Sequence, residues 1–174
     1  VLETLGLPIH YTAVIDFSLF QKAIDQVGGV DVEVVTGFTD KEFPLPGLEN
    51  ALPESSRYET ITFSPGREHM TGATALKFVR SRHAEGDEGT DIARDRRQQQ
   101  VVAALIQKLK SPIFFLSRRN LISFHNLIRK NLDTNLDERL YPALVRIGVD
   151  SYRQPPKRID LSYEPDESDV AILE

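Results

Sequence analysis

The sequence concentrates charge in one stretch, Arg80-Ser81-Arg82-His83 followed after a short gap by Thr90-Asp91-Ile92-Ala93-Arg94-Asp95-Arg96-Arg97-Gln98-Gln99-Gln100. The apolar residues after it are spaced by three, four and seven, which is typical of one helical face: Val102, Leu105, Ile106 and Leu109. Projected backwards, the same stripe turns polar at Asp91, Asp95 and Gln98, with Arg94 on its flank. An apolar stripe that becomes polar has left the core and entered a cleft. We therefore predict that this end of the helix carries the functional site.

Size and composition are those of one ordinary globular domain. The chain has 174 residues, of which 40% are hydrophobic and 27% are charged. Its net charge of −5 argues against a surface built for nucleic acid, so the clustered arginines indicate a site. The absence of cysteine excludes a disulfide framework, a thiolate nucleophile and a cysteine zinc site. No apolar run is long enough to span a bilayer, and the chain opens on Val1, so we read it as a piece of a longer protein.

Alternating and periodic apolar residues predict an α/β architecture. A buried strand over 10–15, a helix over 16–27 and a half-exposed strand over 30–35 follow one another, which favours layers of helices and strands. Residues 36–57 contain three prolines and two glycines, and we expect them to form a surface loop insertion. The remaining predicted elements are a strand at 57–63, a helix capped by Thr71, the central helix before Pro112, helices at 120–130 and 136–147, and a terminal hairpin within 157–174.

The two arginines before the central helix can share one site only if the preceding helix unwinds. The inner stripe of that helix continues to Arg80. Arg82 lies roughly 200° away from Arg80 on an ideal helix. If both arginines serve one site, the helix must unwind near Val79, so that residues i and i+2 point the same way.

The arginines of this stretch are suited to binding phosphate, because a guanidinium offers two parallel N–H groups and keeps its charge when partly desolvated. Four of them are candidates to surround a pyrophosphate: Arg80, Arg82, Arg94 and Arg97. Asp91 is placed to hold Arg94 through an i,i+3 ion pair. The alternative is that Asp91 only caps the helix and that the arginines form salt bridges at the surface. From the spacing alone, both interpretations stay open.

Other polar residues give weaker signals. His69 and His83 lack helical metal-ligand spacing, so we interpret them as ordinary polar residues. The acids of residues 85–91 lack the regular spacing of a calcium loop. No Walker-type loop or Gly-x-Ser-x-Gly motif is present, and Gly28-Gly29 is better explained as the end of a helix.

Several short motifs run through the chain: Gly28–Val32, Pro65–Gly66, Thr71–Leu76, Phe78–Arg82, Asp91–Gln98 and Asn131–Leu136. Together they resemble the LytR-CpsA-Psr family, and Asp91–Gln98 is similar to that family's Asp-x-x-Arg-x-x-Arg-Gln signature. The resemblance covers nearly the whole chain, and we identify residues 1–174 with the C-terminal portion of the family's domain. The combination of motifs is specific, so it favours the phosphate-site interpretation.

The resemblance implies a three-layer α-β-α domain, in which a mixed central sheet is flanked by helices and is incomplete in this chain. It also implies a membrane-anchored enzyme at the extracytoplasmic face of a bacterial cell membrane. Such an enzyme transfers a glycopolymer, of the teichoic acid or capsular polysaccharide type, from a polyprenyl-pyrophosphate carrier to peptidoglycan. The reaction is a phosphoryl transfer assisted by Mg²⁺, which needs positioning and charge stabilisation more than a protein nucleophile.

Family roles carry over residue by residue. The resemblance implies that the pyrophosphate is bound by Arg80, Arg82, Arg94, Arg97 and Gln98. Asp91 and Arg94 are the expected catalytic residues, with Asp91 orienting Arg94. The general base is not identified.

The family's first half has no counterpart in this chain. That half carries the membrane anchor, an additional arginine and the aspartates that hold magnesium, so no metal ligands are expected among these residues. The loop before Asp91 also carries extra acids without an assigned role: Glu85, Asp87 and Glu88. We expect the chain alone to be inactive. The alternative function is a non-catalytic module that binds polyprenyl phosphate or another anionic ligand in envelope regulation; nucleic acid is not expected as a partner.

Overall fold

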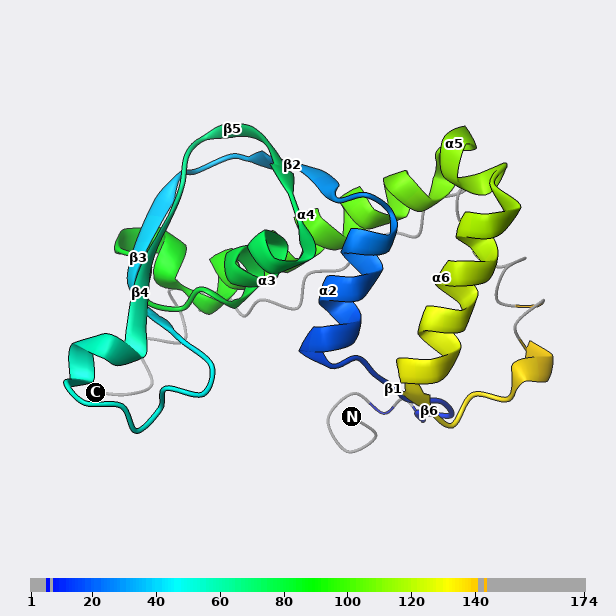
Figure 1. The fold of residues 1–174 in the computed structure, drawn as a ribbon, viewed down its shortest axis with the longest axis horizontal. Helices are drawn as coiled ribbons and strands as arrows, with labels where there is room; N and C mark the ends of the chain where they lie inside the picture. The colour runs from blue at the N-terminus through cyan, green and yellow to red at the C-terminus, as the bar shows by residue number, and fades with distance from the viewer. Residues whose placement is uncertain (1–5, 7, 141–142, 144–174) are drawn as a thin grey trace, which may run out of the picture. The chain divides into compact units, whose positions relative to one another are not determined.

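The computed structural model describes residues 6, 8–140 and 143 (Figure 1). The chain divides into two compact units, 1–134 and 135–174. In the second unit the described part contains the 3-10 helix η3, Glu138–Leu140. The predicted helix over 136–147 lies largely, and the hairpin within 157–174 entirely, outside the described residues. The elements of the first unit are β1 Ala13–Val14, α2 Phe17–Gln26, β2 Val30–Val34, β3 Phe38–Pro44, η1 Glu54–Arg57, β4 Tyr58–Phe63, β5 Gly66–Met70, α3 Gly72–Arg80, η2 Gly86–Gly89, α4 Asp91–Lys110, α5 Pro112–Phe115, α6 Arg118–Asn131 and β6 Asp133–Thr134.

A long antiparallel ribbon forms most of the β structure in the first unit (Figure 1). β2 pairs with β5, with Val30 opposite Met70, and β3 pairs with β4, with Phe38 opposite Phe63. Because β2–β3 and β4–β5 are the two arms of one hairpin joined by residues 45–57, their pairing is antiparallel. The α/β class is confirmed. The described strands form two-stranded antiparallel ladders in place of the expected mixed central sheet.

Two further elements differ from the prediction. β3 lies within the range 36–57 that was expected to be a surface loop, and its Phe38, Asp40 and Phe43 side chains are buried. A shift in register between Asp40 and Phe43 breaks the strict alternation of buried and exposed residues, so the sequence lacks the regular pattern of a strand. The buried strand expected over 10–15 is reduced to β1, whose residues are exposed and pair with β6.

α2 and α3 approach each other closely, and α3 begins at the predicted cap, Thr71. The side chains of Asp16 and Thr71 accept backbone hydrogen bonds at the starts of α2 and α3. The N–H of Gly72 donates to Oδ1 of Asp25 on α2 (2.7 Å). A Cβ atom at Gly72 would overlap the backbone of Gln21, so this position has room only for glycine. The contact fixes α3, which leads to the arginine stretch.

α4 buries a different face from the one that its sequence predicts. The buried residues follow one another at intervals of four, four and three: Ala93, Arg97, Val101 and Ala104. Val102 and Ile106, which were expected in the core, are 50% and 42% exposed. α4 contacts α3 and β2, and alanine side chains on the buried face let these elements come close. The rotation carries Arg97 into the interior.

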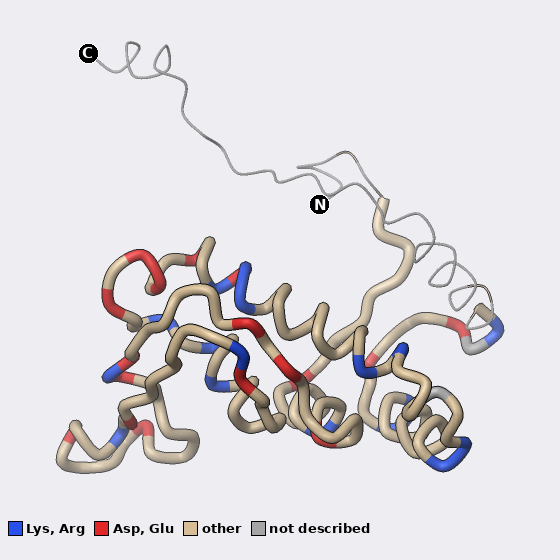
Figure 2. The backbone as a smooth tube through the Cα atoms, turned by 90° about the horizontal axis from the view of Figure 1, so that it is seen from above, with Lys and Arg blue, Asp and Glu red and all other residues tan. Residues whose placement is uncertain are grey.

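The first unit has two helices after α4 in its described part, and only the second of them was predicted. Pro112 begins α5 directly after α4, and α6 is Arg118–Asn131 where a helix over 120–130 was predicted. α6 lies beside α2 (Figure 1). None of the described helices has an apolar stretch long enough to cross a membrane. Figure 2 shows acidic and basic residues interspersed along the described backbone.

Asp31 on β2 joins three basic side chains from β5 and α4. Its carboxylate lies 2.8 Å from Nζ of Lys108, 2.8 Å from Nδ1 of His69 and 3.7 Å from a guanidinium nitrogen of Arg67. Hydrogen bonds from Lys108 and His69 lower the pKa of Asp31 to about 2. The ionised carboxylate therefore stabilises the packing of these elements on β2.

Replacing Asp31 with asparagine is expected to lower the free energy of unfolding at pH 7. The pKa of Asp31 in the folded chain is below its ordinary value of 3.8, so its contribution is present above that value and is lost as the pH falls towards about 2. Urea unfolding of both proteins at a series of pH values measures this effect. A stability difference that stays constant from pH 7 to pH 2 would contradict the assignment.

Candidate functional site

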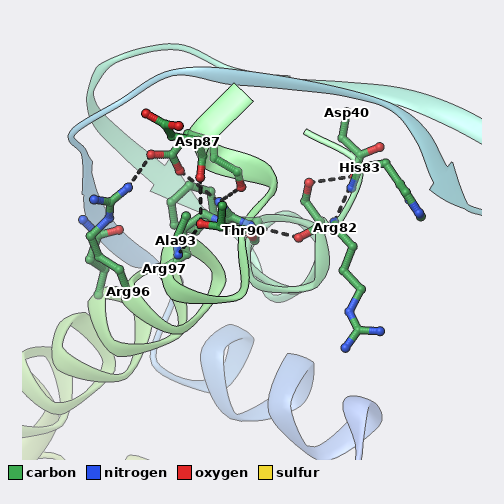
Figure 3. Close-up of polar contacts among 12 residues, drawn as sticks. Asp40, Arg82, His83, Asp87, Thr90, Ala93, Arg96 and Arg97 are labelled. Atoms are coloured by element: carbon green, nitrogen blue, oxygen red, sulfur yellow. Dashed lines mark hydrogen bonds and ion pairs between the residues drawn. The ribbon is translucent and has the colours of Figure 1, made fainter. Parts of the chain in front are cut away.

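A buried aspartate holds the segment that follows α3 (Figure 3). α3 ends at Arg80, and Ser81 leaves the helix with a ψ of 131°. Asp40 of β3 is 0% exposed, and its Oδ2 accepts hydrogen bonds from the Ser81 hydroxyl (2.7 Å) and from the backbone N–H groups of Arg82 and His83 (3.2 Å each). The helix therefore ends at Arg80, which meets the condition under which both arginines can serve one site.

Asp40 is ionised at neutral pH although it is buried. Burial raises the pKa of this carboxyl, but hydrogen bonds from Ser81 and from the backbone of Glu42, His83 and Arg82 outweigh burial and leave the pKa below its ordinary value. The second oxygen, Oδ1, accepts the N–H of Glu42 at 2.9 Å. Protein donors thus replace the water that the carboxylate has lost.

Arg97 points into the interior, where its side chain is 2% exposed. Its guanidinium donates to the carbonyl oxygens of Phe78 (3.0 Å), Ser81 (2.9 Å) and Glu88 (2.8 Å). It also lies over the ring of Phe38, with 4.6 Å from Cζ to the ring centroid. The structure therefore does not bring Arg97 to the pocket where a pyrophosphate contact was predicted. Arg97 instead joins the end of α3 to the loop before α4, because the buried face of α4 is not the predicted one.

Glu88 is the buried partner of Arg97. Its Oε2 lies 2.9 Å from NH1 of Arg97, and its Oε1 accepts a hydrogen bond from Arg96. Burial lowers the pKa of Arg97, while the hydrogen bond and charge of Glu88 raise it. Of the other acids in this loop, Glu85 pairs with Lys41 at 2.6 Å on the surface. The extra acids therefore include one residue that fixes the loop from inside.

Four of the predicted residues line one pocket of approximately 490 Å³. The lining consists of Arg80, Arg82, Arg94 and Gln98, with Phe17, Pro44, Val79 and His83 completing the wall. The Cζ atom of Arg80 lies 4.3 Å from the ring centroid of Phe17 and 5.7 Å from that of Phe43. Stacking against aromatic rings covers the flat face of a guanidinium and leaves its N–H edge available for an anion.

Asp91 pairs with Arg94 at the start of α4, as the i,i+3 spacing predicts. Oδ1 of Asp91 lies 2.7 Å from NH1 of Arg94. The cap of α4 is Thr90, whose hydroxyl accepts the N–H of Ala93 at 3.2 Å. Asp91 is therefore not the capping residue, and the predicted ion pair with Arg94 is formed. The role of Asp91 in orienting Arg94 for a ligand stays a prediction.

The chemistry of the pocket suits a ligand with several negative charges. Its lining contains three arginines and, among the residues that the structure describes, no carboxylate. Arginines at such a site can bind phosphate oxygens through paired N–H groups. Within residues 6, 8–140 and 143, no group of three or more metal-ligating side chains is present, and the lining does not fit a magnesium site.

Sequence reasoning did not assign five residues to this site. Phe17, Pro44, Val79 and His83 line the pocket, and Asp40 accepts hydrogen bonds from Ser81, Arg82 and His83 without lining it. The signal for Phe17 and His83 was only their proximity in sequence to a helix start and to Arg82. Asp40 gave no signal, because it lies in a range whose prolines and glycines indicate a loop.

The chain is similar in sequence to one protein family and to several known proteins. The model of the LytR_cpsA_psr family matches residues 1–170. Over 107 residues the chain is 35% identical to the polyisoprenyl-teichoic acid–peptidoglycan teichoic acid transferase TagV of Bacillus subtilis, covering 62% of this chain and 24% of that protein. Over 134 residues it is 34% identical to the corresponding transferase TagU of Bacillus mycoides, covering 77% and 36%.

The fold agrees with a solved structure of the first relative. The crystal structure of B. subtilis TagV superimposes with a TM-score of 0.55 and 28% identity, covering 84% of this chain and 48% of that chain. The chain spans 24% and 36% of the length of the two curated relatives. The match over residues 1–170 shows that the chain belongs to the LytR_cpsA_psr family.

Proposed function

We propose that this chain forms the carrier-binding part of a transferase that moves a glycopolymer from a polyprenyl-pyrophosphate carrier to peptidoglycan. The observation that carries the proposal is the single pocket lined by Arg80, Arg82, Arg94 and Gln98. Each of these residues was predicted from sequence to contact the pyrophosphate. The relatives TagV and TagU, which are named as polyisoprenyl-teichoic acid–peptidoglycan teichoic acid transferases, support the class of substrate.

The proposed reaction joins the phosphate next to the glycan to an acceptor hydroxyl of peptidoglycan. The hydroxyl oxygen attacks that phosphorus and loses its proton, the bridging P–O bond of the pyrophosphate breaks, and polyprenyl phosphate leaves with the electron pair and can take up that proton. Negative charge grows on the leaving oxygen and on the phosphoryl oxygens. In this proposal Arg80, Arg82 and Arg94 stabilise that charge, while Asp91 keeps Arg94 in place.

Location and cofactor are further parts of the proposal. A carrier of this kind and a peptidoglycan acceptor place the enzyme at the extracytoplasmic face of a bacterial membrane, to which an anchor outside this chain would attach it. Mg²⁺ would neutralise pyrophosphate charge when bound. Because the lining of this pocket does not fit a magnesium site, we assign the ion to ligands in the family's N-terminal portion and derive no step from it here.

Binding is expected to follow the charge of the carrier head group. Calorimetric titration with short-chain polyprenyl pyrophosphate, the matching monophosphate and the matching alcohol should give the highest affinity for the pyrophosphate. We expect the monophosphate to bind at least about tenfold more weakly, because it forms fewer charged hydrogen bonds. The dissociation constant for the pyrophosphate should rise with salt.

As a control, the same titrations are carried out with and without magnesium, because the pocket supplies arginines and no carboxylate to bind the ion. An alcohol that binds as tightly as the pyrophosphate would contradict the proposed site. The non-catalytic alternative predicts the same binding order. Release of polyprenyl phosphate by the full-length protein, in the presence of a peptidoglycan acceptor, separates the transferase from that alternative.

A further inference from the structure

We propose that Asp40 is a positioning residue of the pyrophosphate pocket, because it holds residues 81–83 in the conformation that carries Arg82 into the pocket. This inference rests on the proposed function. Asp40 does not line the pocket itself and is 0% exposed, so it acts through the segment that it binds.

The hydrogen bonds of Asp40 converge on three consecutive residues. Oδ2 accepts from the hydroxyl of Ser81 and from the N–H groups of Arg82 and His83 (Figure 3). In a continuing helix those N–H groups would bond to carbonyl oxygens four residues earlier. Asp40 gives them another acceptor, so the chain leaves the helix without leaving these donors unpaired.

The conformation at Ser81 decides where Arg82 points. On an ideal helix Arg82 would lie roughly 200° from Arg80, on the opposite side of α3. With α3 ended at Arg80, both side chains line the same pocket. The same carboxylate oxygen binds the N–H of His83, which is also a lining residue.

Burying a carboxylate costs free energy unless hydrogen bonds replace the water that it loses. In the described part of the chain, Asp40 has no ion pair, and its donors are the Ser81 hydroxyl and three backbone N–H groups. Its charge thus serves the local backbone conformation, and through it the placement of Arg82.

A double-mutant cycle tests this inference. We would measure the dissociation constant of inorganic pyrophosphate by calorimetry, and stability by urea unfolding, for the full chain and for Asp40→Ala, Arg82→Ala and the double variant. Each single substitution is expected to weaken binding about tenfold. The double variant should bind no more weakly than Arg82→Ala, because Asp40 acts through that residue. Losses that multiply in the double variant would overturn the inference.

Asp31→Asn is the matched control, since it also removes a hydrogen-bonded carboxylate from the ribbon but lies outside this pocket. It should lose stability and keep its affinity for pyrophosphate. Equal losses of affinity in Asp31→Asn and Asp40→Ala would show a general effect on the fold and overturn the inference. If Asp40→Ala does not fold, Ser81→Ala removes one of the same hydrogen bonds and takes its place in the cycle.

Amide hydrogen exchange provides a reading that needs no ligand. The N–H groups of Arg82 and His83 should be protected in the unchanged protein and should exchange faster in Asp40→Ala, whereas α4 amides should not change. Unaltered protection would overturn the role of Asp40. Failure of the unchanged chain to bind pyrophosphate would instead count against the proposed function, and the exchange experiment would still decide the positioning role.

Discussion

Replacing Arg97 with methionine is expected to lower the free energy of unfolding by about 3–5 kcal/mol, the range measured when one partner of a buried ion pair is removed. Methionine keeps much of the side-chain volume but cannot donate to the carbonyl oxygens of Phe78 and Ser81. It also leaves the buried carboxylate of Glu88 without its Arg97 partner. Equilibrium unfolding in urea measures the loss.

Two further variants separate the causes of that loss. Arg96→Met removes the other partner of Glu88. The side chain of Arg96 is 51% exposed, so this substitution should lower the free energy of unfolding less than Arg97→Met does. Adding Glu88→Gln to Arg97→Met should recover part of the stability, because it removes the uncompensated charge. If Arg97→Met unfolds at the same urea concentration as the unchanged protein, Arg97 does not join α3 to α4 as described.

Replacing Arg94 with alanine is expected to weaken pyrophosphate binding about 10- to 100-fold while leaving the fold intact. Hydrogen bonds between charged groups contribute about 1.5–3 kcal/mol each, which corresponds to this range of affinity. Arg94 lines the pocket, and its side chain makes an ion pair with Asp91 that is open to solvent. Because exposed pairs contribute little to stability, the substitution should shift the unfolding midpoint only slightly. Calorimetry with inorganic pyrophosphate measures the loss of affinity.

The local elements of the fold could be predicted where short-range rules decide. Thr71 caps α3 as expected, and the alternation from Val30 to Val34 gives a strand with one buried face. Pairing between strands could not be derived, because it depends on contacts between distant segments. The apolar residues at 10–15 illustrate the limit, since their β propensity gives only the exposed strand β1.

The site was predictable in its chemistry and less so in its division of roles. Residue types and the spacing of Asp91 and Arg94 indicated an anion site with an oriented arginine, and the ion pair is formed. Arg97 shows what periodicity could not reveal. The apolar stripe through Val102 predicted one buried face of α4. The alanines at 93 and 104 allow another face to pack instead, and that face carries the guanidinium of Arg97 into the interior, where it donates to backbone carbonyl oxygens.

The central claim concerns two arginines of the Asp91–Gln98 signature. Arg94 lines the ligand pocket, whereas Arg97 is buried and joins the end of α3 to the loop before α4. Side-by-side calorimetric titration of inorganic pyrophosphate into the unchanged chain, Arg94→Ala and Arg96→Ala tests it most directly. Arg96 is the matched control, because it lies two residues away on the same helix and binds Glu88 outside the pocket. We predict that Arg94→Ala loses about 10- to 100-fold in affinity and Arg96→Ala less than about threefold. Equal losses in the two variants, or no loss in Arg94→Ala, would contradict the assignment of the pocket.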